Sequence, residues 1–185
     1  MTAKRPPASG AGTGRTPYRI AVVCLGNICR SPMAQVVLAE RIIAAGLSDE
    51  VEVVSAGTGG WHLGDPMDRR AAALLTRKGY DATRHEARQL TADWFDRCDL
   101  VLAMDAQNRR DIAALGPTAE PRLFRDFDPD APVNGDRDVP DPFFGGDDGF
   151  DEVLAMVERT AEALVAELMR TREADVGPAA REAGG

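Results

Sequence analysis

Short apolar runs alternate with helical stretches along most of the chain. The runs at 18–23 (YRIAVV), 51–55 (VEVVS) and 100–104 (LVLAM) have the length and continuous apolar character of buried parallel strands, and a short fourth strand is predicted at 123–124. Residues 150–170 place their apolar side chains on one stripe of a helix. This alternation predicts an α/β fold in which helices cover both faces of a parallel sheet.

Residues that favour helix N-caps precede the expected helices. Ser31 is followed by a proline, which suits a first helical turn, and the helix that begins there is expected to end at Gly46. The segment 125–149 is rich in proline, glycine and aspartate, and it is predicted to be a long loop. The other predicted N-caps are Asp68, Thr91 and Asp105.

Length and composition bound the domain organisation. The chain has 185 residues, 44% of them hydrophobic, which suits one compact domain and excludes a wholly disordered chain. Residues 1–17 and 172–185 lack hydrophobic periodicity and are predicted to be flexible tails. The single domain is therefore expected to span residues 18–171.

Charge and cysteine content narrow the function classes. With 30 acidic and 22 basic residues, the net charge of −8 argues against a nucleic-acid partner, which would favour a basic face. No apolar run approaches the roughly 20 residues of a membrane span, and residues 1–17 hold no apolar stretch like that of a secretory signal. A cytoplasmic protein without a membrane partner is predicted. The three cysteines have no recognised zinc-ligand spacing, so no metal or other cofactor is expected.

The segment 24–32 (CLGNICRSP) carries the most specific chemistry. It lies between the first strand and the first helix, where backbone N–H groups and the helix N-terminus form an anion-binding site. A thiol in that position, here Cys24, is readily deprotonated, and Arg30 can bind an oxyanion through two N–H groups. A thiolate beside a phosphate site predicts covalent phosphoryl transfer to cysteine.

Other residues of this segment strengthen the prediction. A cysteine six positions before an arginine arises easily by chance. The alternative to a catalytic thiolate is a buried cysteine that only packs at the end of a strand. However, Gly26 permits close backbone approach, Asn27 tolerates a left-handed conformation, and Ser31 can form a hydrogen bond with the sulfur of Cys24. Together with the strand before it and the helix after it, the segment favours a phosphate-binding loop.

The segment CLGNICRSPMA resembles the signature loop of the low-molecular-weight protein tyrosine phosphatases. The resemblance covers about residues 18–170 and implies a doubly wound, three-layer sandwich with a four-stranded parallel sheet. It also implies an enzyme that hydrolyses phosphotyrosine and small aryl phosphates through a cysteinyl-phosphate intermediate. The further segments that carry the resemblance, in chain order, are VSAGT at 54–58, Trp61, Gly79-Tyr80-Asp81, His85, Ala103-Met104-Asp105 and VPDPFFG at 139–145.

A general acid that protonates the leaving phenolic oxygen is expected in the predicted loop 125–149. This loop holds many aspartates, and residue chemistry alone does not choose among them. The resemblance implies Asp141, which lies between two prolines and precedes two phenylalanines. It also implies that His85 supports the phosphate-binding loop through a hydrogen bond to Asn27. Asp105 is expected to cap a helix, to fix the loop of Asp141, or to do both.

Aromatic residues are expected to form the walls of the substrate cleft. Trp61, Phe143 and Phe144, with Leu25, would make it deep enough for a phenyl phosphate and too deep for phosphoserine. At the position of Ile28, arginine-phosphate phosphatases of the superfamily resemble one another in having a smaller threonine. The larger isoleucine of this chain therefore favours phosphotyrosine as the substrate. The predicted catalytic residues are Cys24, Arg30 and Asp141, and the predicted substrate-binding residues are Leu25, Gly26, Asn27, Ile28, Cys29, Ser31, Trp61, Phe143 and Phe144.

Phosphotyrosine-containing proteins are the expected partners, with phosphate or vanadate as ligands of the site. Three alternatives remain open. A thiol-dependent arsenate reductase would need a cysteine relay, and no cysteine follows Cys98. A non-catalytic phosphate-binding module would be expected to lack one of the three catalytic residues, all of which are present. A phosphatase specific for phosphoarginine is the nearest alternative. The resemblance also implies that Cys29 captures an oxidised Cys24 as a reversible disulfide.

Overall fold

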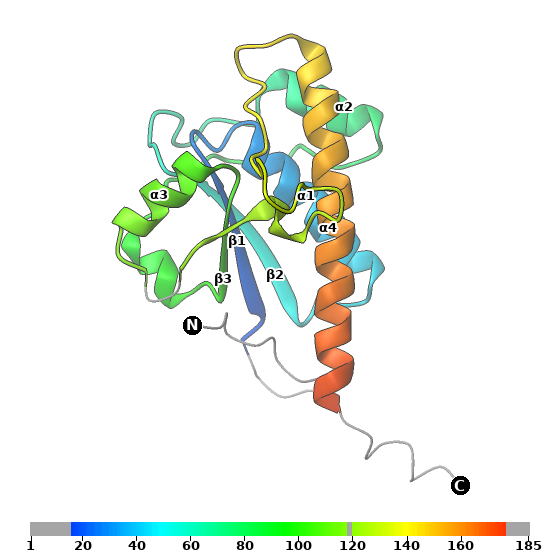
Figure 1. Ribbon diagram of the computed structural model, residues 1–185. Coiled ribbons are helices and arrows are strands. Elements are labelled where there is room, and N and C mark those ends of the chain that lie inside the picture. Colours follow the sequence, from blue (N-terminus) through cyan, green and yellow to red (C-terminus); the bar gives the residue numbers. More distant parts are fainter. Residues whose placement is uncertain (1–15, 118–119, 177–185) are drawn as a thin grey trace, which may run out of the picture.

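The computed structural model describes residues 16–117 and 120–176. Its strands form one parallel sheet in the order β2-β1-β3-β4 (Figure 1). The four-stranded parallel sheet that the resemblance implies is confirmed. The strands are β1 (Tyr18–Cys24), β2 (Val51–Gly57), β3 (Leu100–Ala103) and β4 (Arg122–Leu123).

Helices cover both faces of this sheet. Helices α1 and α4 pack together on one face, and α2 packs against α4. Helix α3 and the 3₁₀ helix η1 pack on the opposite face. This arrangement confirms the doubly wound α/β fold. The helices are α1 (Arg30–Ala44), α2 (Arg69–Arg77), η1 (Ala92–Asp96), α3 (Ala106–Ala114), η2 (Phe124–Phe127) and α4 (Asp147–Val176).

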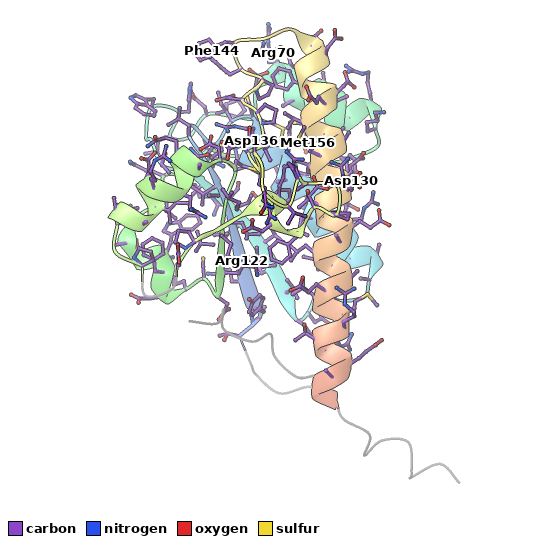
Figure 2. All side chains as sticks on the ribbon, in the orientation of Figure 1. Arg70, Arg122, Asp130, Asp136, Phe144 and Met156 are labelled. Carbon is purple, nitrogen blue, oxygen red and sulfur yellow. The ribbon has the colours of Figure 1, made fainter. Side chains whose placement is uncertain are left out.

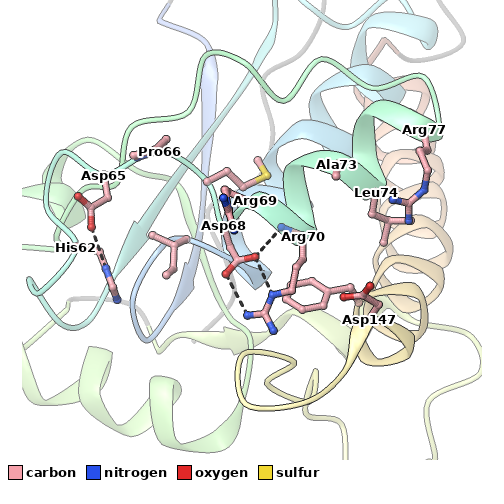
Figure 3. Close-up of a pocket in the computed structure, with 13 residues that line it drawn as sticks. His62, Asp65, Pro66, Asp68, Arg69, Arg70, Ala73, Leu74, Arg77 and Asp147 are labelled. Carbon is pink, nitrogen blue, oxygen red and sulfur yellow. Dashed lines mark hydrogen bonds and ion pairs between the residues drawn. The ribbon is translucent and has the colours of Figure 1, made fainter.

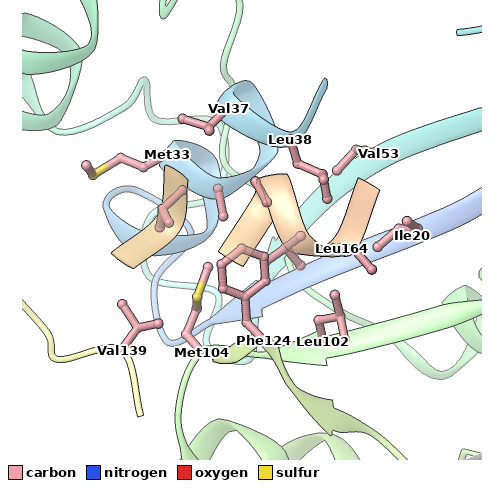
Figure 4. Close-up of a cluster of buried hydrophobic side chains, with 14 of the residues drawn as sticks. Ile20, Met33, Val37, Leu38, Val53, Leu102, Met104, Phe124, Val139 and Leu164 are labelled. Carbon is pink, nitrogen blue, oxygen red and sulfur yellow. The ribbon is translucent and has the colours of Figure 1, made fainter. Parts of the chain in front are cut away.

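The side chains of the central strand β1 divide the core between the two faces. Ile20 and Val22 belong to the larger cluster, beneath α1 and α4, whereas Val23 joins a smaller cluster with Ile112 of α3. Because both faces of β1 are buried from Ile20 to Cys24, this part of its sequence is a continuous apolar run without a polar alternate position. Figure 4 shows the larger cluster, in which the ring of Phe124 is completely buried.

Of the four predicted helix caps, two bond to the helices that they begin and two do not. Asp68 and Asp105 each accept a hydrogen bond from a backbone N–H of the helix that they begin. Ser31 was expected to cap the first helix, but α1 begins at Arg30 and Ser31 lies within its first turn. The hydroxyl of Ser31 instead contacts the sulfur of Cys24. The hydroxyl group that could have capped the helix is therefore used to contact the sulfur of Cys24.

The last strand and the following loop also differ from the prediction. The strand expected at 123–124 is β4 at Arg122–Leu123, because Phe124 already begins η2. The carboxylate of Asp126 accepts a hydrogen bond from the N–H of Leu123, which favours the turn. The segment 125–149 is therefore not one continuous loop. The hydroxyl of Thr91 likewise bonds to the side chain of Asp93 rather than to a helix N–H.

Helix α4 is longer than the apolar stripe at 150–170. It begins at Asp147 and extends to Val176, so residues 172–176, which were assigned to the tail, are helical. Arg172 forms an ion pair with Glu50 across this extension. Residues 1–15 and 177–185, most of the two predicted tails, lie outside the described residues. Within the described part of the chain, no helix is long and apolar enough to cross a membrane, and the cytoplasmic location stays a prediction.

The carboxyl ends of the strands meet at one edge of the sheet. Cys24 pairs with Gly57 in the register of β1 and β2, and Val23 pairs with Ala103 in that of β1 and β3. The loops that follow these three strands therefore lie next to one another. The strand order reverses between β1 and β3, and ligands of open α/β sheets bind at such a point.

Candidate active site

The loop between β1 and α1 has a tightly fixed backbone. Among the described residues, Asn27 alone combines a side chain with a positive φ, 56°, the left-handed conformation that its sequence position led us to expect. The loop packs directly on the backbone of β2, since a Cβ at Gly57 would lie 2.7 Å from the carbonyl oxygen of Leu25. The first turn of α1 follows, with N–H groups that have no acceptor within the helix. The segment thus has the form of an anion-binding loop.

The side chain of Asn27 holds this loop together. Its Nδ2 donates to the hydroxyls of Ser31 (2.8 Å) and Ser55 (2.9 Å), and its Oδ1 accepts from the N–H of Arg88 (2.8 Å). Asn27 is completely buried, so every polar atom of its amide has a partner away from water. The amide therefore links the loop to α1, to β2 and to the segment before η1.

His85 supports the same loop from outside. Its Nε2 lies 2.7 Å from the carbonyl oxygen of Asn27, which is the contact that the resemblance implied. Burial lowers the pKa of His85 below its ordinary value, although the hydrogen bond to Asn27 opposes this shift. A neutral imidazole that donates from Nε2 fits this position.

The sulfur of Cys24 lies at the centre of the loop. It is 3.0 Å from the hydroxyl of Ser31 and accepts a hydrogen bond from the N–H of Asn27 at 3.3 Å. The hydroxyl of Ser31 is itself 3.3 Å from the carbonyl oxygen of Ala56 on β2. Donors that surround a sulfur stabilise its thiolate form and make it a better leaving group.

Arg30 is almost completely buried beside this sulfur and is held by two carboxylates. Its Nη1 donates to Asp105 (2.6 Å) and to the carbonyl of Val139 (3.1 Å), and its Nη2 donates to Asp141 (3.0 Å). Burial opposes the charge of Arg30, but the negative charges of Cys24 and the two aspartates outweigh it and raise the pKa of the guanidinium. The arrangement fixes the direction of the guanidinium.

Asp141 lies at the mouth of the site on a loop with fixed ends. Its side chain is 36% exposed, and its Oδ1 accepts from the N–H of Phe143 (3.1 Å). The N–H of Val139 donates to the carbonyl of Met104 at the end of β3 (2.7 Å). The side chain of Asp138 accepts from the first N–H of α3 (2.8 Å). The Asp141 loop is therefore attached to the edge of the sheet just before the carboxylate.

A buried ionic cluster holds the same loop from behind. Arg125 donates from Nη1 to the carbonyl of Asp138 (3.0 Å) and from Nε to the carboxylate of Asp128 (2.9 Å). The side chain of Asp128 is completely buried and also accepts two bonds from Arg159 of α4 (2.7 and 2.9 Å). We call Arg125, Asp128 and Arg159 the loop-supporting cluster. Nothing in the local sequence pattern indicated it, because its members lie up to 34 positions apart.

A cavity of about 160 Å³ opens above the loop, and the predicted aromatic residues form its rim. Trp61 and Phe144 are 75% and 93% exposed, so neither belongs to the core. Figure 2 shows Phe144 near Arg70, at the end of the molecule where α4 begins. The rings of Phe143 and Phe144 meet edge to face at 5.0 Å. The lining residues are Cys24, Leu25, Gly26, Ile28, Cys29, Arg30, Trp61, His62, Asp141, Phe143 and Phe144.

Two of the predicted substrate-binding residues do not line this cavity. The side chains of Asn27 and Ser31 are directed into the structure of the loop, as their hydrogen bonds show. His62, which the sequence left unassigned, does line the cavity, and its ring lies against Gly26. Its position directly after Trp61 was the signal that could have placed it there.

The three cysteines do not form a relay. Cys29 lines the cavity, and its pKa is raised by burial and by the negative charges of Asp68, Cys24 and Asp141, so it is a neutral thiol. Cys98 precedes β3 at the opposite edge of the sheet, where Asp99 bonds to Arg19 near the start of β1. Strand geometry separates that edge from Cys24 by roughly 17 Å. An arsenate reductase relay through Cys98 is therefore excluded by distance.

Comparison with known proteins agrees with this geometry. The model of the family described as low molecular weight phosphotyrosine protein phosphatase matches residues 19–174. A curated low molecular weight protein-tyrosine-phosphatase of Streptomyces coelicolor is 51% identical over 153 residues, which cover 80% of this chain and 92% of that protein.

Two solved structures extend this comparison. The crystal structure of YfkJ from Bacillus subtilis is 31% identical with a TM-score of 0.78, over 85% of this chain and 98% of YfkJ. The structure titled as the arginine phosphatase of Drosophila is 29% identical with a TM-score of 0.72, over 80% of this chain and 96% of that chain. Proteins named as tyrosine phosphatases and a protein named as an arginine phosphatase are thus both similar to this chain.

Proposed function

Since the chain belongs to the low molecular weight phosphotyrosine protein phosphatase family and is a phosphoric monoester hydrolase, we propose that Cys24, Arg30 and Asp141 carry its catalysis. The observation that supports this most directly is their position around one cavity, with Arg30 in contact with Asp141 and the Cys24 sulfur within the anion-binding loop. We further propose phosphotyrosine as the substrate.

In the first step, the thiolate of Cys24 attacks phosphorus in line with the phenolic oxygen. The S–P bond forms, the P–O bond to the phenol breaks, and Asp141 gives its proton to the leaving oxygen. The loop N–H groups and Arg30 bind the equatorial oxygens, where charge is held in the transition state. Asp105 and Val139 keep Nη1 of Arg30 in place, and Nη2 donates to Asp141 (3.0 Å), so the guanidinium is held between the loop and the proposed acid.

In the second step, the carboxylate of Asp141 takes a proton from water, whose oxygen attacks the phosphorus of the cysteinyl-phosphate. The new P–O bond forms as the S–P bond breaks, and inorganic phosphate leaves. The electron pair returns to the sulfur of Cys24, where the hydroxyl of Ser31 at 3.0 Å stabilises the thiolate. The second proton transfer restores Asp141 to the acid form.

The shape of the cavity supports an aromatic phosphoester as the substrate. Trp61, Phe143 and Phe144 stand around its mouth and would contact a phenyl ring on the way to the loop. A phosphoserine would have to reach the same phosphate site with a much shorter side chain. Ile28 narrows the cavity beside the loop, which disfavours the longer, branched phosphoarginine.

Steady-state hydrolysis of phosphotyrosine, phosphoserine and phosphoarginine, measured side by side without added metal, tests this proposal. We expect phosphotyrosine to be the best substrate and Cys24→Ser to remove turnover. Asp141→Asn should slow phenyl phosphates with poor leaving groups much more than those with good leaving groups, because only the former need a proton. Phosphate and vanadate should inhibit competitively.

Two results would count against the proposal. Faster hydrolysis of phosphoarginine would keep the mechanism and replace the substrate. Binding of vanadate without turnover of any phosphoester would instead indicate a phosphate-binding module.

A further inference from the structure

A second cavity, of about 630 Å³, adjoins the catalytic cavity and shares Ile28 and His62 with it. Helix α2 forms one wall, and the start of α4 forms another (Figure 3). We call it the α2 groove, defined by Ile28, His62, Arg69, Ala73, Arg77 and Asp147. The groove begins at the rim of the catalytic cavity. A substrate peptide whose phosphorylated side chain enters the catalytic cavity can therefore extend into the α2 groove.

Some of the charged groups of the groove are already engaged. Arg70 pairs with Asp68 (3.1 Å) and donates to the carbonyls of Phe143 (3.0 Å) and Gly145 (3.3 Å). Its guanidinium also lies 4.6 Å from the centre of the Phe150 ring. These contacts hold Arg70 as part of the wall. At the other end of the groove, Asp65 pairs with His62 at 3.0 Å (Figure 3).

Two arginines of the groove have exposed side chains. Within residues 16–117 and 120–176, the side chains of Arg69 and Arg77 form no hydrogen bond and no ion pair. They lie eight positions apart on one face of α2, with the small Ala73 between them, so about 12 Å separates their backbones. An extended peptide spans that distance with about four residues. The one opposing carboxylate in the groove that lacks an ion-pair partner in the described chain is Asp147.

We propose that the α2 groove binds acidic residues that flank the phosphotyrosine of a protein substrate, with Arg69 and Arg77 as the recognising cations. This inference rests on the proposed function. The two cavities share only Ile28 and His62 among their lining residues, so acidic residues should matter on the side of the phosphotyrosine that passes these two residues and not on the other. The small Ala73 lets the peptide backbone approach α2 between the two guanidinium groups.

The test compares p-nitrophenyl phosphate, which is too small to enter the groove, with four phosphotyrosine peptides. Their flanks are neutral, acidic before the phosphotyrosine, acidic after it, and basic on both sides. The variants are Arg69→Glu, Arg77→Glu, their combination, and Asp147→Asn. The matched control is Arg170→Glu, which makes the same charge change on α4 about 30 Å from Phe150 along the helix.

For the wild-type protein, one of the two acidic peptides should have the lowest KM. Each arginine substitution should raise that KM by about two- to fivefold, and the double variant by about tenfold, with kcat nearly unchanged. Asp147→Asn should lower the KM of the same acidic peptide, because it removes a negative charge from the groove. Hydrolysis of p-nitrophenyl phosphate and of the neutral peptide should remain at the wild-type level in all variants, and Arg170→Glu should match the wild type throughout.

The inference is overturned if the acidic peptides are bound no better than the neutral one, or if the double variant retains the preference. It is also overturned if Arg170→Glu has the same effect, since the preference would then come from net charge. Failure of the proposed function looks different, because the neutral phosphotyrosine peptide would not be hydrolysed. In that event the same four flanks, carried on phosphoarginine, test the groove.

Discussion

The loop-supporting cluster gives the sharpest prediction about stability. The carboxylate of Asp128 accepts four hydrogen bonds, from Arg125, from Arg159 twice and from the N–H of Asp130. Burial opposes its ionisation, but the bonds from Arg159 and Arg125 outweigh burial and lower its pKa from 3.8 to about 2. This shift corresponds to about 2 kcal/mol of folding free energy at neutral pH.

The perturbation is Asp128→Asn, which keeps the shape of the side chain and removes its charge. The variant also leaves the guanidinium groups of Arg125 and Arg159 without their counter-charge, and Arg125 is only 10% exposed. We therefore expect the free energy of unfolding at pH 7 to fall by about 2–4 kcal/mol. Because Arg125 holds the carbonyl of Asp138, hydrolysis of esters with poor leaving groups should also slow.

The pH dependence distinguishes this account from a general loss of packing. A carboxylate whose pKa is lower in the folded state stabilises the fold fully above pH 3.8, and this contribution is lost as the pH falls toward 2. The difference between Asp128→Asn and the wild type should thus be constant from pH 8 to about pH 5, with about half of the charge contribution gone at pH 3. Urea unfolding at each pH measures it.

The control for this experiment is Asp130→Asn, because Asp130 also pairs with Arg159 but has a side chain that is 70% exposed. It should change the free energy of unfolding by less than about 1 kcal/mol. Equal effects of the two variants, or a loss of stability for Asp128→Asn that does not depend on pH, would refute the reasoning.

Three further substitutions test the loop and the cavity. Gly57→Ala places a Cβ 2.7 Å from the carbonyl oxygen of Leu25, so the loop must move, and kcat/KM for p-nitrophenyl phosphate should fall by about a hundredfold while the protein stays folded by circular dichroism. Burial lowers the pKa of His85, so wild-type stability should decrease as the pH falls below 6.5; in His85→Gln, which keeps a donor for Asn27, urea unfolding should show a weaker decrease. Ile28→Thr removes apolar volume shared by both cavities and should move the ratio of phosphoarginine to phosphotyrosine hydrolysis toward phosphoarginine by about tenfold, as measured by kcat/KM.

The sequence predicted those parts of the fold that depend on neighbouring residues. The buried strand β1 was visible as a continuous apolar run, and Asp68 and Asp105 were visible as caps because a cap bonds within its own helix. Ser31 was misassigned as a cap, because its hydroxyl bonds to a sulfur seven positions earlier. β4 was misplaced by one residue because a two-residue strand has little pattern of its own.

The candidate site was predictable to a similar extent. Cys24 and Arg30 belong to one short loop, and their spacing is a property of the sequence. Asp141 needed the resemblance, since many aspartates of its loop have the same local chemistry. The loop-supporting cluster and the place of His62 in the cavity depend on contacts between distant segments, and no periodicity in the sequence encodes such contacts.

The most direct test of the central claim is identification of the covalent intermediate. The protein is mixed with p-nitrophenyl phosphate, quenched in acid within the first turnover, digested, and examined by mass spectrometry. The account predicts one phosphoryl group on the peptide that contains Cys24, and none in Cys24→Ser. A phosphoryl group on another residue, or full turnover by Cys24→Ser, would contradict it.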